Sequence, residues 1–98
     1  MPEVTVVYWR DIPAQVIVGK GRRGAKVPLP ERFEQAIDRA AMRSGAAETD
    51  DYLAEWRKVS EGATEGEPEA VAAQRAAALE AEWDAERLKA VAMNGGRA

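Results

Sequence analysis

The chain contains no cysteine and no histidine among its 98 residues. Without cysteine it forms no disulfide bond and has no thiolate nucleophile, and without both residue types it lacks the usual ligands of zinc. Histidine is also the most common general base, so the familiar nucleophile–base pairs of hydrolases are excluded. We therefore do not expect an enzyme, and we expect no catalytic residue, no metal and no cofactor in this chain.

Long hydrophobic runs are absent as well. A membrane-spanning helix needs about 20 apolar residues, and no segment approaches that length. Met1-Pro2-Glu3 shows neither the basic nor the apolar region of a signal peptide. We therefore expect no membrane partner and a cytoplasmic location. The net charge of −3 is opposite in sign to that of a typical nucleic-acid-binding domain, so nucleic acid is not expected as a partner.

The first part of the chain has the composition of a small antiparallel sheet. Residues 4–9 are mostly β-branched or aromatic, which favours a strand. Asp11-Ile12-Pro13 interrupts this run, residues 14–18 form a second apolar segment, and a short third strand is predicted around residues 25–27. The connections are too short for parallel crossovers, so the pattern predicts a three-stranded antiparallel β-meander.

Two short helices are predicted to pack on this meander. The first begins after Pro30, has an apolar face that starts with Phe33 and Ile37, and ends at Gly45. The second begins near Thr49. Its apolar face contains Tyr52, Leu53 and Trp56. The fold class is therefore predicted to be α+β.

The composition changes in the last third of the chain. Residues 1–59 are predicted to form the small α+β domain, and the small, acidic residues 60–67 indicate a linker. The alanine-rich residues 68–93 predict a longer C-terminal helix. Its apolar residues do not form one stripe, so packing on the domain and binding in trans are both open. Residues 94–98 are predicted to be a disordered tail.

A glycine-rich turn contains the sequence Gly-Lys-Gly-Arg-Arg-Gly from Gly19 to Gly24, which matches the spacing of dinucleotide-binding loops. That motif requires a helix to begin at the glycines, whereas Pro28 and Pro30 follow here. We interpret the segment as a cationic hairpin turn. Either it binds a phosphate or carboxylate, or it is a solvated tip that keeps the sheet edge soluble. Its cations are Lys20, Arg22, Arg23 and Lys26.

Aromatic residues supply a second candidate surface. Tyr8 and Trp9 are adjacent in a predicted strand, so their side chains face opposite sides of the sheet. If one face is uncovered, it presents an aromatic residue to a partner; otherwise these residues belong to the core. Arg10 either points at a ligand or forms a surface pair in the turn. The candidate binding residues are therefore Tyr8, Trp9, Arg10 and Trp56 together with Lys20, Arg22, Arg23 and Lys26.

Several segments resemble one family in order. They are Trp9-Arg10-Asp11-Ile12-Pro13-Ala14-Gln15-Val16, Arg32-Phe33, Ala36-Ile37-Asp38-Arg39-Ala40-Ala41-Met42, Asp51-Tyr52-Leu53 and Trp56-Arg57. Over roughly residues 3–58 the chain resembles the small bacterial virulence factor domain. In some relatives this domain is one part of a longer protein with an Nfu-like scaffold domain and helical repeats. The resemblance also implies that stand-alone members lie in gene neighbourhoods of folate and corrinoid one-carbon enzymes. The resemblance implies an accessory or adaptor role and supplies no catalytic residues.

These observations lead to one expected function and one alternative. We expect a non-catalytic adaptor or accessory subunit that binds a larger protein through the cationic turn and an aromatic residue on an open sheet face. The alternative is a small anion- or nucleic-acid-binding module that uses the basic turn from Lys20 to Lys26. The sequence does not specify the oligomeric state.

Overall fold

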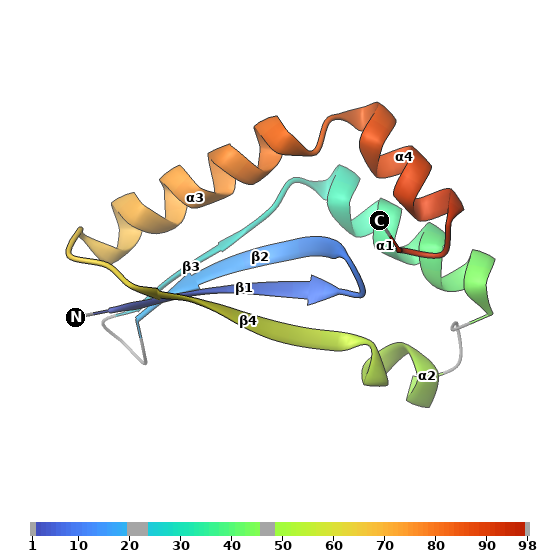
Figure 1. Cartoon of the computed structure of the whole chain (residues 1–98), viewed down its shortest axis with the longest axis horizontal. Helices are drawn as coiled ribbons and strands as arrows, with labels where there is room; N and C mark the ends of the chain where they lie inside the picture. Colours follow the sequence, from blue (N-terminus) through green and yellow to red (C-terminus); the bar gives the residue numbers. More distant parts are fainter. Residues whose placement is uncertain (1, 20–23, 46–48, 98) are drawn as a thin grey trace.

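The computed structural model describes residues 2–19, 24–45 and 49–97, and it has an α+β fold (Figure 1). In this part of the chain the elements are β1 (Glu3–Trp9), β2 (Ile12–Val18), β3 (Ala25–Pro28), α1 (Glu31–Ser44), α2 (Thr49–Ala54), β4 (Trp56–Ala63), α3 (Pro68–Glu82) and α4 (Ala85–Met93). The strands form one antiparallel sheet in the order β3-β2-β1-β4. The α+β class and the meander of the first three strands are therefore confirmed.

The fourth strand corrects the sequence-based prediction. The sequence predicts a helix through Trp56 and a linker from residue 60, whereas residues 56–63 pair with β1 along its whole length. Without this pairing, β1 would be an unprotected edge strand beside an apolar face. A register shift between Val4 and Thr5 accommodates the strand near Gly62, whose φ is +96°. Long-range pairing thus overrides a composition that is typical of a loop.

The alanine-rich segment is two helices that pack on the rest of the fold. α3 lies over β2 and β3, and α4 packs beside α1 (Figure 1). The break comes at Trp83, and the Asp84 side chain then caps α4 by accepting a hydrogen bond of 2.8 Å from the backbone N–H of Arg87. Ala72 and Ala76 of α3 are buried, and such small side chains allow the helix to approach the sheet closely.

The hydrophobic core lies between the sheet and the layer that contains α1, α3 and α4. Val6, Val16 and Val18 are completely buried, and Phe33 and Ile37 of α1 join the same cluster. Figure 1 shows these three helices on one side of the sheet, with α2 where β4 begins. The opposite face of the sheet is therefore left open along most of its length.

The end of the chain also differs from the prediction of a frayed tail. Residues 94–97 lie against the β1–β2 turn, where the backbone N–H of Asp11 donates to the Gly96 carbonyl at 2.9 Å. Gly95 and Gly96 are buried, with φ angles of +70° and +88° that turn the chain back toward the sheet. A Cβ at Gly96 would lie only 3.0 Å from the Trp9 ring. The two glycines thus cover the core at Trp9 and are not part of a frayed tail.

Candidate functional site

The open face of the sheet is built from alternate residues of its strands. Lys58, Val7 and Gln15 are direct partners across β4, β1 and β2. Paired residues of antiparallel strands point to the same face, and neighbours along a strand point to the other. Since Val6 and Val16 point into the core, this row points away from it. A second row on the open face contains Ser60, Thr5, Ile17 and Lys26.

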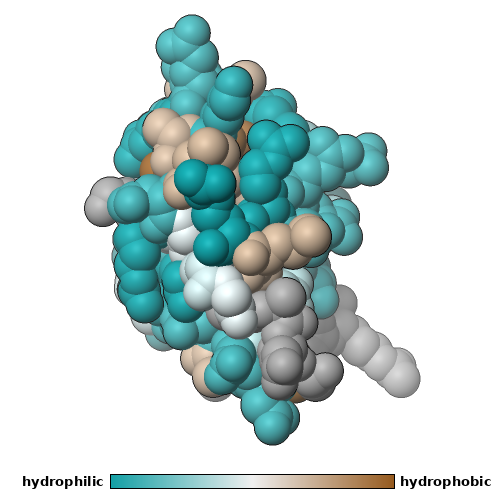
Figure 2. All heavy atoms as spheres, turned by 90° about the vertical axis from the view of Figure 1, so that its right-hand side faces the viewer, coloured by the Kyte–Doolittle hydropathy of each residue, from teal (hydrophilic) through white to brown (hydrophobic). Residues whose placement is uncertain are grey.

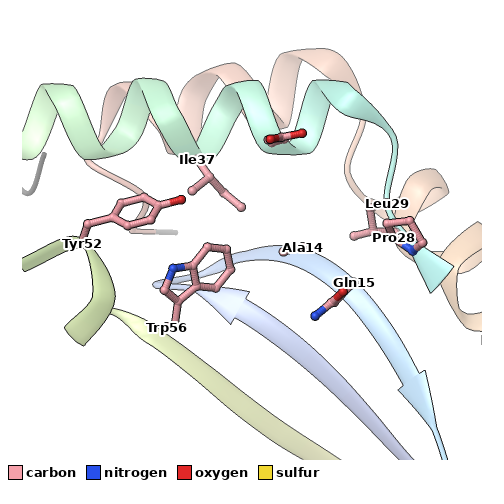
Figure 3. Close-up of a pocket in the computed structure, with 8 residues that line it drawn as sticks. Ala14, Gln15, Pro28, Leu29, Ile37, Tyr52 and Trp56 are labelled. Carbon is pink, nitrogen blue, oxygen red and sulfur yellow. The ribbon is translucent and has the colours of Figure 1, made fainter. Parts of the chain in front are cut away.

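A pocket lies at the end of this face, between α1 and the sheet (Figure 3). Its volume is about 240 Å³. Figure 3 shows Tyr52 and Trp56 on one side, Ile37 above them, and Leu29 and Pro28 at the far end. We call this the aromatic pocket. Its lining residues are Ala14, Gln15, Pro28, Leu29, Glu34, Ile37, Tyr52 and Trp56.

A shallower hollow lies beside the aromatic pocket on the open face. It is lined by Val7, Gln15, Trp56, Arg57 and Lys58. Because Gln15 and Trp56 line both hollows, the two lie next to each other. We call the shallower part the sheet-face groove. The candidate site is therefore a pocket with a groove beside it.

The two aromatic side chains of the pocket are held by local structure and by Trp9. The rings of Tyr52 and Trp56 stand nearly perpendicular, at 87°, with their centres 5.8 Å apart. Tyr52 also packs on Trp9, whose indole N–H donates a hydrogen bond of 2.9 Å to the Tyr52 carbonyl. The fully buried Trp9 thus holds the end of α2 next to the start of β4.

The pocket has a negative electrostatic environment. Burial raises the pKa of the Tyr52 hydroxyl above its ordinary value, and the nearby carboxylates of Asp38 and Glu34 raise it further. Glu34 is itself part of the pocket lining. Both carboxylates disfavour the negative charge of an ionised Tyr52 hydroxyl. For the same reason they favour a positive charge in the pocket.

Comparison with known families identifies the domain. A model of the family described as "Virulence factor" matches residues 7–92. The chain belongs to the virulence factor family. The match extends beyond the segments recognised in the sequence, which end near residue 58, and includes α3 and most of α4. No curated protein and no solved structure matches the chain.

Arg10, one of the predicted binding residues, has a structural role in this virulence factor domain. Its backbone has a φ of +54°, which is unusual for a residue other than glycine. The guanidinium donates a hydrogen bond of 2.7 Å to the Gly95 carbonyl, lies 3.4 Å from a carboxylate oxygen of Glu55, and stacks on Trp9. Arg10 therefore joins the β1–β2 turn to the end of the chain.

Neither Tyr8 nor Trp9 supplies the predicted aromatic residue on the open face. Trp9 is fully buried, because Tyr52 and the glycines near the end of the chain cover it. Tyr8 is half-buried, with the guanidinium of Arg57 over its ring at 5.0 Å. Trp56 is instead the aromatic residue that reaches both hollows.

The basic turn is only partly described by the structure. Lys20, Arg22 and Arg23 lie outside the described residues, so their part in binding stays a prediction. Lys26 is exposed in β3 and belongs to a row on the open face. The described glycine at the start of the turn, Gly19, has a φ of +83°, which suits the turn chemistry expected there.

Of the eight residues that line the pocket, only Trp56 is on the list of candidate binding residues; Tyr52, Gln15 and Glu34 are the other lining residues with aromatic or polar side chains. Tyr52 is four residues before Trp56, a spacing that indicated a shared face but was assigned to a core helix. Gln15 is a polar residue in an otherwise apolar strand, which is a usable signal for an open face. Glu34 carries no local signal, because its role depends on where α1 lies relative to β2.

Other parts of the described structure offer weaker sites. Within residues 2–19, 24–45 and 49–97, acidic side chains do not gather in a group of three that could hold a metal ion, and no helix is long and apolar enough to cross a membrane. The end of the molecule in Figure 2 is mostly hydrophilic, with small hydrophobic areas between polar side chains. The large exposed hydrophobic residues are Met42, Leu53 and Met93, which lie on three different helices. Such scattered residues are common on protein surfaces.

Proposed function

We propose that this chain is a non-catalytic protein-binding module, an adaptor or accessory subunit that docks a segment of a larger protein on its open sheet face. The observation that carries the proposal is the unequal cover of the sheet. Helices cover the face that carries the completely buried Val6 and Val16, whereas the other face is hollowed around Trp56 and Val7. Concave, partly apolar surfaces with a large aromatic residue are typical of binding sites.

The geometry favours an extended segment as the docked element. β4 is eight residues long and lies at the edge of the sheet, and in the described part of the chain only β1 pairs with it. β3, at the other edge, is four residues long and ends at Pro28, which cannot donate a hydrogen bond. A segment added beside β4 would gain main-chain hydrogen bonds, with its side chains directed to the groove.

Charge on this face indicates what else the segment carries. Lys58 lies in the groove, and Lys26 lies in the neighbouring row of the same face. An acidic side chain of the partner would be steered to these lysines. The family resemblance suggests the larger proteins of one-carbon metabolism, the folate and corrinoid enzymes, as the first partners to examine.

Affinity purification from the native cell, followed by reconstitution, tests this proposal. The bait is the tagged full chain, with Lys58→Glu and Trp56→Ala as open-face variants. Lys89→Glu on α4 is the matched control, because it reverses the same charge on another exposed surface. We expect the purified partner to bind the wild type and the control equally. Loss of an aromatic hot spot weakens binding by about thirtyfold or more, which is the effect we expect for Trp56→Ala.

Two results would overturn the proposal. One is equal recovery of the same proteins by the wild type and both open-face variants. The other is failure of every recovered protein to form a stoichiometric complex when the purified components are mixed. Circular dichroism of each variant establishes that its fold is retained.

A further inference from the structure

Most aromatic side chains of this domain are already paired with an arginine. The chain has three tryptophans, two tyrosines and one phenylalanine. The guanidinium carbons of Arg10, Arg32 and Arg57 lie 5.0 Å from the ring centres of Trp9, Phe33 and Tyr8, respectively. Arg87 lies 4.1 Å from the ring centre of Trp83. Among the described residues, the aromatic side chains without such a partner are Tyr52 and Trp56.

These two side chains are the ones that line the aromatic pocket. Their perpendicular rings form a corner, and Glu34 lines the same pocket from α1. A cation in this corner would meet the ring electrons and a carboxylate together, which are the two features that attract a guanidinium or ammonium group. The carboxylate of Asp38 also acts on Tyr52. The pocket therefore offers both aromatic rings and negative charge to a positively charged group.

We propose that the aromatic pocket binds the guanidinium of an arginine side chain supplied by the docked partner segment. This inference rests on the proposed function, and it names the anchor residue of the partner. Arginine fits better than lysine because its planar group stacks on aromatic faces, and this domain uses arginine at each of the four pairs above.

The size and position of the pocket support a side chain rather than a free cofactor. Its volume of about 240 Å³ is below the roughly 300–1,000 Å³ of pockets that hold drug-sized ligands. The pocket also adjoins the sheet-face groove, with which it shares Gln15 and Trp56. A segment paired with the edge of β4 can therefore direct an arginine to the pocket and another side chain to the groove near Val7.

The test compares two probes that differ in charge but have nearly the same shape. N-acetyl-arginine-N-methylamide carries a guanidinium, whereas the citrulline analogue carries a neutral urea group. Binding to the full chain is followed by the NMR shift of the Trp56 indole N–H, assigned with Trp56→Phe. We expect the arginine probe to bind about three- to thirtyfold more tightly than the citrulline probe.

Variants of single residues identify the groups that bind the arginine probe. Glu34→Gln should reduce the affinity for the arginine probe toward that of the citrulline probe. Glu31→Gln, which removes a carboxylate from the first turn of the same helix but not from the pocket lining, should leave the affinity unchanged. Trp56→Phe should retain part of the affinity and Trp56→Leu should lose it, which is followed by the NMR shifts of backbone amides of the pocket because both variants lack the Trp56 indole.

The inference is overturned if the two probes bind equally, if neither binds, or if Glu34→Gln has no effect. Its failure is distinct from failure of the proposed function. A partner that depends on Lys58 and Trp56 while the probes bind alike removes the arginine anchor and leaves the docking face. Charge-selective probe binding without any partner that depends on the open face supports the pocket and removes the docking function.

Discussion

Trp9 and Trp56 are direct partners across β1 and β4, yet they have opposite surroundings. Trp9 is completely buried, with its indole N–H bonded to the Tyr52 carbonyl, whereas Trp56 is partly exposed and lines both hollows of the open face. Residue type and strand position are the same for both. What differs is the cover that Tyr52 and the end of the chain place over Trp9. One tryptophan therefore stabilises the fold, and the other is available for binding.

The largest expected effect separates these two tryptophans by stability. Trp9→Ala should lower the free energy of unfolding by about 3–5 kcal/mol, because it leaves a large cavity in the core. Trp56→Ala should lower it by less, about 1–2 kcal/mol, because the side chain is only partly buried and lies at the margin of the core. Chemical denaturation of both variants gives the comparison. Equal losses of stability would mean that Trp56 is as much a core residue as Trp9.

A second prediction concerns the glycine that covers Trp9. Gly96→Ala places a Cβ 3.0 Å from the Trp9 ring and 3.4 Å from the Ala40 Cβ, at a φ of +88°. Strain and overpacking together should cost about 2–4 kcal/mol. Gly62→Ala is the matched control, because its φ is +96° but its Cβ would meet no atom within 4 Å. It should cost only the backbone strain, about 1–2 kcal/mol.

Thermal or chemical unfolding of the two glycine variants measures the difference. If Gly96→Ala is no more harmful than Gly62→Ala, the end of the chain does not seal Trp9 in solution. The comparison between the two tryptophans would then lose its structural explanation.

The parts of the fold that could be predicted from the sequence are those with strong local signals. β-branched residues marked β1, and Pro30 and Gly45 marked the two ends of α1. β4 has no such signal, since its second half contains Ser60, Glu61 and Gly62. It is a strand because β1 offers an unpaired edge, and that depends on residues about fifty positions away.

The candidate site shows the same division. Alternation along β1 correctly placed Tyr8 and Trp9 on different faces, but it could not show that distant residues cover Trp9. Trp56 was recognised as an aromatic candidate, but it was assigned to a helix. The groove, which depends on Trp56 lying in β4, could therefore not be predicted. Glu34 could not be recognised at all, because its place in the pocket depends on packing of α1 near β2. The residue types of the site could be predicted from the sequence, but which of them distant segments bury could not.

The smallest expected effect compares Tyr8 of β1 with Tyr52 of α2 through the ionisation of their hydroxyl groups. Burial is the main cause of the raised pKa of both Tyr52 and Tyr8; Asp38 and Glu34 raise that of Tyr52 further, and Glu61 does so for Tyr8 against the opposing effect of Arg75 and Arg57. Below the unfolded-state pKa of about 10, both states keep the proton and stability is unaffected. Above it, the unfolded chain loses protons first, so the free energy of unfolding falls as pH rises.

Denaturation at pH values from about 9 to about 11.5 tests this slope against that of Tyr52→Phe and Tyr8→Phe. Each variant should flatten the alkaline decline, and the double variant should flatten it most. Glu34→Gln should lower the pKa of Tyr52 in a spectroscopic titration and leave that of Tyr8 unchanged, because Glu34 acts on the pocket alone. If Glu34→Gln moved neither pKa, the carboxylate would be too far from the Tyr52 hydroxyl to make the pocket negative. The argument for a cation at Trp56 would then rest on the rings alone.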